Sequence, residues 1–169
     1  MKQLRQQQGF TMIELIMVIV ILGVLSAFAL PRFADLGQSA RIAAMQGLAG
    51  SMKSAIGITR AQVFASGANS NAATGTVTLD DATVNLVYGY PSGVGASPGI
   101  LVASGIDVIS TLAADTNTFI NGDYTYLNDG GVLTIYPTSQ TNCVITYTEA
   151  ADASTAPAID TTAINTTNC

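Results

Sequence analysis

The sequence predicts an α+β fold, in which a long N-terminal helix packs on an antiparallel β-sheet head that carries a C-terminal disulfide loop. Three observations lead to this prediction. Residues 10–30 form an almost continuous apolar run, residues 31–66 continue with apolar side chains at helical spacing, and residues 67–169 alternate short β-like runs with turn residues. We therefore expect a helix of two halves and a globular head, preceded by residues 1–9 as a short basic leader.

The composition narrows the function before any motif is considered. The chain has 169 residues, the size of one domain, of which 10% are charged and 49% are hydrophobic. It contains no His, so acid–base chemistry and metal binding through imidazole are excluded. All six Lys and Arg residues lie in the first 60 positions, and residues 61–169 carry nine acids and no base. A surface without Lys or Arg cannot neutralise phosphates, so we expect no nucleic-acid partner for this part.

The apolar run near the N-terminus is long enough to span a membrane. Residues 10–30 read FTMIELIMVIVILGVLSAFAL, and as a helix they would be about 31 Å long, which matches a bilayer core. The preceding MKQLRQQQG has two bases and no acid, so the start should stay in the cytoplasm while the rest crosses. A cleaved secretory signal, with its cleavage site at Ala27-Phe28-Ala29, and a plain anchor are the alternatives. Neither explains Glu14, because a carboxylate in lipid costs free energy.

The start of this run carries a specific motif. The segment Gly9-Phe10-Thr11-Met12-Ile13-Glu14-Leu15, placed after a short basic leader, resembles the cleavage motif of type IV prepilins. The resemblance implies that a prepilin peptidase cuts between Gly9 and Phe10 on the cytoplasmic face and methylates the new amine of Phe10. It also implies that Glu14 is needed for subunits to join a growing filament.

Glu14 also has a role on physical grounds. An unpaired carboxylate in lipid is destabilising, and a cation at the same depth would relieve it. No base lies within residues 10–30, so the nearest cation is the freed ammonium group of Phe10. We predict an intersubunit pair between the Phe10 amine and Glu14. The alternative is a carboxylate that merely reaches the headgroups.

The second half of the predicted helix begins at a weak point. Pro31 removes one backbone hydrogen bond, so a kink is expected near residue 30, and Gly23 adds local weakness. The resemblance implies that the helix loosens between Gly23 and Pro31 when subunits pack. Residues 32–65 are expected to form an amphipathic helix, whose several glycines would allow close approach to the chain's own sheet or to a neighbouring subunit. Its repeated apolar or small residues are Leu48, Met52, Ala55, Thr59 and Val63.

The head is predicted to be a sheet with one helix. Asp129-Gly130-Gly131 is a good hairpin turn between two β-like runs. Ser97-Pro98 is typical of a helix cap followed by a first-turn proline, which predicts a helix from residue 98 to about residue 112. The Ala- and Thr-rich stretch from residue 149 onwards is expected to be irregular. The predicted strands are 76–79, 83–88, 123–128, 132–136 and 143–148.

Cys143 and Cys169 are expected to form a disulfide, because the predicted topology places them outside the cytoplasm, where thiols oxidise. The bond would bound the region 143–169 and hold the tail. Two Cys residues without His make a weak metal site, and no base is available to activate a Cys nucleophile. The Asp and Asn residues between positions 115 and 129 lack the spacing of a calcium-binding EF-hand loop, so we expect solvated turns, no metal and no cofactor.

Within the type IV pilins, the chain is most similar to the mannose-sensitive haemagglutinin (MSHA-type) pilins. The similarity is carried by ALPRF at 29–33, GLAG at 47–50, VYGYP at 87–91 and the two ends of the region 143–169. It implies a structural subunit of a Gram-negative surface filament for attachment and biofilm growth. It also implies an inner-membrane subunit pool, a prepilin peptidase and an assembly machinery driven by a cytoplasmic ATPase.

The need to bury the apolar helix predicts nearly the same function as the resemblance to pilins does. An apolar rod extracted from lipid must be buried again, and identical rods achieve this in water by packing into a helical filament. Four bases on the predicted helix would then meet acids of neighbouring subunits. The alternatives are a type II secretion pseudopilin, which the disulfide loop disfavours, a DNA-uptake pilin, which the base-free head disfavours, and a membrane-anchored enzyme limited to acid-pair chemistry. We expect a self-associating subunit that is not an enzyme. The four bases are Arg32, Arg41, Lys53 and Arg60.

Overall fold

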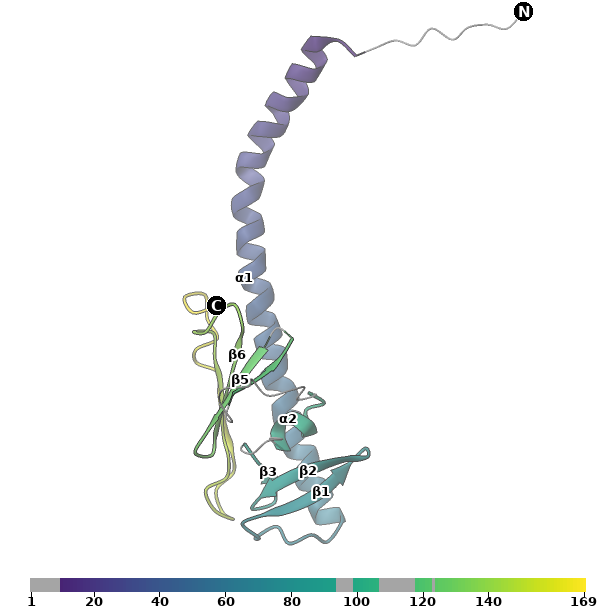
Figure 1. The fold of residues 1–169 in the computed structure, drawn as a ribbon, viewed down its shortest axis with the longest axis vertical. Coiled ribbons are helices and arrows are strands. Elements are labelled where there is room, and N and C mark those ends of the chain that lie inside the picture. The colour runs from purple at the N-terminus through teal and green to yellow at the C-terminus, as the bar shows by residue number, and fades with distance from the viewer. Residues whose placement is uncertain (1–9, 94–98, 107–117, 123) are drawn as a thin grey trace, which may run out of the picture. The chain divides into compact units, whose positions relative to one another are not determined.

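The computed structural model describes residues 10–93, 99–106, 118–122 and 124–169 (Figure 1). The chain divides into two compact units, residues 1–39 and residues 40–169, and each is described by itself.

One long helix, α1 (Met12–Ala65), begins in the first unit and continues along the chain into the second. Pro31 lies inside this helix, and the backbone is helical on both sides of it. Pro31 therefore does not end the helix, and the bend expected near residue 30 stays a prediction. A single proline removes only one backbone hydrogen bond, and the residues around it include several good helix formers.

Within the second unit, α1 buries one face and exposes the other. The buried residues recur at three- and four-residue intervals, as predicted for an amphipathic helix, and Leu48 is half-buried beside them. A Cβ atom added at Gly47, Gly50 or Gly57 would meet no atom within 4 Å. These three glycines therefore do not serve close packing of α1 against the chain's own sheets. The buried face consists of Met45, Ala49, Met52, Ala55, Thr59 and Val63.

The first sheet has three antiparallel strands, which are adjacent in chain order. Asp80 and Asp81 form the two-residue turn between the first two strands, with φ of 45° and 68°. Both angles are positive, as a type I′ hairpin turn requires. Tyr88 and Gly89 form the next turn, also with positive φ. The strands are β1 (Gly75–Leu79), β2 (Ala82–Val87) and β3 (Tyr90–Pro91).

The second sheet has five antiparallel strands, again adjacent in chain order. The predicted hairpin at Asp129-Gly130-Gly131 is confirmed, because Asp129 pairs with Val132 across a turn whose two glycines have φ of 54° and 89°. The strands are β4 (Thr118–Asn121), β5 (Tyr124–Asp129), β6 (Val132–Pro137), β7 (Ile145–Thr148) and β8 (Ala158–Asp160).

Two strand predictions need correction. The strand predicted from residue 143 starts at Ile145, because Cys143 is held in a turn by its N–H bond to the carbonyl oxygen of Gln140. The tail predicted to be irregular contains β8, whose Ile159 pairs with Tyr147 and packs against the core. One apolar residue in a three-residue strand is too short a pattern to recognise in the sequence.

The helix predicted from residue 98 to about residue 112 is also shorter than expected where it is described. It forms α2 (Gly99–Ala103), and residues 98 and 107–112 of the prediction lie outside the described residues. Gly105, with φ of 73°, ends α2 in a Schellman motif. In this motif the N–H of Ile106 bonds to the carbonyl of Leu101 and the N–H of Gly105 to that of Val102, at 2.9 and 3.0 Å.

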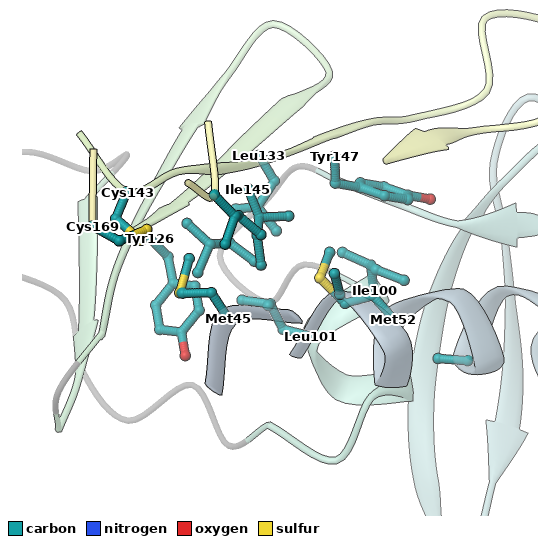
Figure 2. Packing of buried hydrophobic residues seen from close by; sticks show 14 residues of the cluster. Met45, Met52, Ile100, Leu101, Tyr126, Leu133, Cys143, Ile145, Tyr147 and Cys169 are labelled. Atoms are coloured by element: carbon teal, nitrogen blue, oxygen red, sulfur yellow. A yellow bond between two sulfur atoms is a disulfide. The ribbon is translucent and has the colours of Figure 1, made fainter. Parts of the chain in front are cut away.

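The core of the second unit lies between α1, α2 and the five-stranded sheet (Figure 2). Tyr147 also ties the two sheets together, because its hydroxyl donates to the carbonyl of Pro91. Glu149 adds a second tie, since its Oε2 accepts the N–H of Gly93 at 2.9 Å. The buried side chains that Figure 2 labels are Met45, Met52, Ile100, Leu101, Tyr126, Leu133, Cys143, Ile145, Tyr147 and Cys169.

Candidate functional site

The first turn of α1 is closed by a capping box between Thr11 and Glu14. The Oε2 atom of Glu14 accepts the backbone N–H of Thr11 at 2.8 Å and its hydroxyl at 2.9 Å. The N–H of Glu14 in turn donates to Oγ1 of Thr11 at 3.3 Å. This reciprocal pair satisfies backbone donors that a helix start otherwise leaves free. Glu14 therefore has a local structural role that the sequence analysis missed, although the pattern Thr-x-x-Glu before an apolar run indicates it.

The apolar run that follows lies fully at the surface of the first unit. Every large hydrophobic side chain from Met12 to Leu25 is at least half exposed, and Phe10 is 95% exposed. By length and composition, α1 is the one helix in the described residues that could cross a membrane, with a mean hydropathy of 2.7 in its most apolar window. An apolar surface of this extent needs lipid or protein around it.

The other predicted residues of this segment are placed as follows. Gly23 lies in the exposed run, and a Cβ atom there would meet nothing within 4 Å. Pro31 lies in α1 and is exposed. Gly9, the predicted residue before the cleavage site, lies outside the described residues, whereas Phe10 directly precedes the capping box.

The predicted disulfide between Cys143 and Cys169 is confirmed. Both residues belong to the buried core, with exposed fractions of 0% and 5% (Figure 2). Nε of Arg41 on α1 donates to a backbone oxygen of Cys169 at 2.9 Å. The far end of the disulfide loop is therefore attached to the helix as well as to Cys143.

Two of the four bases expected to face neighbouring subunits are engaged within the second unit instead. One is Arg41, through Cys169. The other is Arg60, which donates to the carbonyl oxygen of Tyr88 at 2.9 Å and lies 4.7 Å from the ring centre of Phe64 and 4.4 Å from that of Tyr90. Lys53 is exposed on α1, which leaves it open to a partner outside the subunit.

Two acidic residues of the head, Asp152 and Asp160, accept local hydrogen bonds in turns. Oδ1 of Asp152 accepts the hydroxyl and N–H of Ser154 and the N–H of Thr155, and these hydrogen bonds lower the pKa of Asp152. The hydrogen bond from the N–H of Thr162 likewise lowers the pKa of Asp160. Among the described residues, no group of three or more His, Cys, Asp or Glu could hold a metal ion. Most of the Asp and Asn positions weighed for calcium, including Asp115 and Asp123, lie outside the described residues.

Comparison with known proteins agrees with this geometry. Residues 4–30 match the family model of the prokaryotic N-terminal methylation motif. The chain is 39% identical to the type IV narrow pilus major component PilA5 of Thermus thermophilus over 120 residues, which cover 70% of this chain and 90% of that protein. It is 44% identical to the fimbrial protein EcpC of Eikenella corrodens over 50 residues, which cover 30% of this chain and 33% of that protein. No solved structure matches the chain significantly.

The methylation motif lies on the capped, exposed apolar helix, and the similarity to the Thermus protein extends well beyond that helix. The matched proteins are structural pilus subunits, a family not known as enzymes. The chain belongs to the type IV pilin family.

Proposed function

We propose that this pilin polymerises through α1 into an MSHA-like surface filament that serves attachment and biofilm growth. One observation carries the proposal: the exposed apolar run of α1 contains a single charged residue, Glu14, at its capped start. Such a surface is stable in lipid before assembly, and in water only when copies of the helix bury it.

The maturation steps follow from the motif. A prepilin peptidase cuts the chain between Gly9 and Phe10 and methylates the new amine. The subunit waits in the inner membrane of a Gram-negative cell until the pilus assembly machinery extracts it. Support for the cut comes from the position of Phe10, which is exposed and lies directly before the capping box, where a new N-terminus would not disturb α1.

Glu14 then pairs with the Phe10 amine of a neighbouring subunit. In the described residues, both recorded hydrogen bonds to this carboxylate end on Oε2. Oε1 is thus the oxygen left for an intersubunit partner, and the pair can form without opening the cap. A buried carboxylate that keeps two hydrogen bonds and gains a cation avoids the cost of an unpaired charge.

Flexibility of α1 during packing is assigned to Gly23 and Pro31. The surroundings of Gly23 are open, and Pro31 lacks one backbone donor inside the continuous helix. Loosening between these residues lets the apolar run adjust its direction to the neighbouring helices.

The test separates the charge of Glu14 from its capping role. Glu14→Gln keeps an oxygen that can accept the N–H of Thr11 but removes the charge, whereas Thr11→Val removes the hydroxyl of the cap and keeps the charge. We expect Glu14→Gln and Glu14→Ala to be processed and methylated normally but to form few or no filaments. Thr11→Val should form filaments. Mass spectrometry of the membrane fraction measures processing, and electron microscopy with quantification of sheared pili measures assembly.

Abundant filaments in Glu14→Gln would contradict the charge pair and leave the cap as the role of Glu14. A purified mature product that starts after residue 29 would contradict the whole proposal, since the apolar helix would then be a discarded signal. Attachment is tested by comparing surface retention of parent cells with that of Glu14→Gln cells. Equal retention of filamented and bald cells would contradict the adhesive part.

A further inference from the structure

Strand β1 lies at the edge of the three-stranded sheet. It pairs with β2 over all five of its residues, and in the described part of the chain no strand lies on its other side. Its sequence, Gly-Thr-Val-Thr-Leu, has no charge and no proline. Val77 is buried, whereas Thr76 and Thr78 are exposed on the opposite face.

The hairpin register determines which backbone groups of β1 point outwards. The two-residue turn at Asp80-Asp81 makes Leu79 and Ala82 the closing hydrogen-bonded pair. Residues alternate along an antiparallel strand, so Val77 also points its N–H and C=O toward β2. Thr76 and Thr78 point theirs away from β2, toward the open edge.

Among the described residues, the three other edge strands of the two sheets are shorter than β1. β3 has two residues and ends in Pro91, and β4 has four. β8 has three, follows Pro157 and ends in the exposed Asp160. Proline, charge and short length are the devices that keep sheet edges from pairing with other chains, and β1 has none of them within its span.

We propose that β1 pairs antiparallel with β1 of a second copy of this chain in an adjacent filament, and that this edge-to-edge contact bundles filaments laterally. The proposal rests on the filament proposed above. With Val77 opposite Val77 of the second copy, Thr76 lies opposite Thr78 in both directions. Each of these two pairs exchanges two backbone hydrogen bonds, and Thr–Thr pairs across strands are favourable.

The charges at the end of β1 select the antiparallel arrangement. Asp80 and Asp81 follow directly after the strand, so a parallel pair would bring four carboxylates together. In the antiparallel pair each Asp-Asp turn lies beside the uncharged start of the other strand, at Gly75. The full chain carries a net charge of −5, and cleavage after Gly9 removes two of its bases, so two filaments still repel each other at long range, and salt screens this repulsion.

A short two-strand contact is weak alone, but a filament presents one copy of β1 per subunit. Once one pair of β1 strands joins two filaments that lie side by side, the other copies of β1 are held close to their partners. Each further contact is then effectively intramolecular, so many weak contacts together give strong binding. Bundles should therefore form from assembled filaments and not from dispersed subunits.

The test compares filaments sheared from cells that express the parent chain, Thr78→Pro or Thr78→Val. Proline at an edge position whose N–H faces outwards is tolerated by the β1–β2 hairpin but removes the donor for a second chain. Valine keeps the donor and the shape of the side chain. We expect bundles of parent and Thr78→Val filaments, increasing with salt, and single filaments for Thr78→Pro. Low-speed sedimentation and electron microscopy measure bundling.

Bundling of Thr78→Pro filaments at the parent level would overturn the proposal, and so would parent filaments that stay single at every salt concentration. If Thr78→Val filaments also failed to bundle, the contact would depend on the hydroxyl of Thr78 and not on strand pairing. This result would overturn the proposal too. Should Thr78→Pro fail to assemble, the double variant Thr76→Glu/Thr78→Glu decides, because it places like charges opposite each other and must give single filaments. A parent strain without filaments would instead contradict the proposed function.

Discussion

Reduction of the Cys143–Cys169 disulfide should destabilise the second unit by an amount that follows from the loop it closes. The two residues are 26 positions apart, so the bond closes a loop of 27 residues. The chain-entropy relation gives about 3.5 kcal/mol for a loop of this size. The hydrogen bond from Arg41 to the backbone oxygen of Cys169 does not depend on the bond between the sulfurs, so it remains available in the reduced protein. The loss should therefore come mainly from the greater freedom of the unfolded chain.

Urea unfolding of the full chain in detergent micelles measures this loss. The near-ultraviolet circular dichroism of the buried tyrosines Tyr126 and Tyr147 reports the folded second unit. With a urea dependence of about 2 kcal/mol per M, the midpoint should fall by about 1.8 M on reduction. Cys143→Ser/Cys169→Ser, which cannot form the bond, should unfold near the reduced parent whether or not reductant is present. Coinciding midpoints for oxidised and reduced parent would refute the loop-closure reasoning.

Three further stability predictions use the same unfolding assay. Gly99→Ala should cost about 1 to 3 kcal/mol, because a Cβ atom there overlaps the backbone carbonyl oxygen of Asn85 in β2. Gly57→Ala, with open space around it, should instead stabilise by up to about 1 kcal/mol. Equal effects of the two substitutions would contradict this close approach of α2 to β2. Burial raises the pKa of Tyr126 from 10.0 to about 12, so its contribution to stability is complete below pH 10 and is lost as the pH rises through about 12. Tyr126→Phe should make the loss of stability above pH 10 smaller, and the rest of the loss should remain because burial also raises the pKa of Tyr147. Arg60→Met should cost about 1 to 3 kcal/mol in the isolated subunit, because the hydrogen bond to Tyr88 and the contacts with the two aromatic rings are lost. A variant as stable as the parent would contradict this role within the subunit and would favour a role of Arg60 as a cation that pairs with another subunit.

Elements with strong local patterns could be predicted from the sequence. The period of Met52, Ala55, Thr59 and Val63 gave the buried face of α1, because a helix must turn one stripe toward its core. The Gly130-Gly131 pair identified a hairpin turn, because few other residues adopt two successive positive φ angles.

Two features were missed although the sequence carries their signals. Thr11 and Glu14 have the spacing of a capping box, and their local hydrogen bonds form whether or not the charge of Glu14 has a partner in another subunit. The pair Ser104-Gly105 is a typical helix end, and it stops α2 long before the predicted residue 112.

Other features could not be predicted because their partners are distant in the chain. Arg41 donates to a backbone oxygen 128 positions away, and Arg60 donates to one 28 positions away. A basic residue on a helix has the same local signature whether its partner is a carbonyl of its own chain or an acid of another. Only the folded arrangement distinguishes a cation that fastens the subunit from one, such as Lys53, that is exposed to other molecules.

The ties made by Tyr147 and Glu149 have a mechanical consequence. Tyr147 lies in β7, an interior strand of the five-stranded sheet, and Glu149 follows directly after it, while their partners Pro91 and Gly93 belong to β3 and the residues just beyond it. A pulling force on the three-stranded sheet is therefore passed to an interior strand of the five-stranded sheet, which has a paired neighbour on each side, rather than to an outer strand that could peel away.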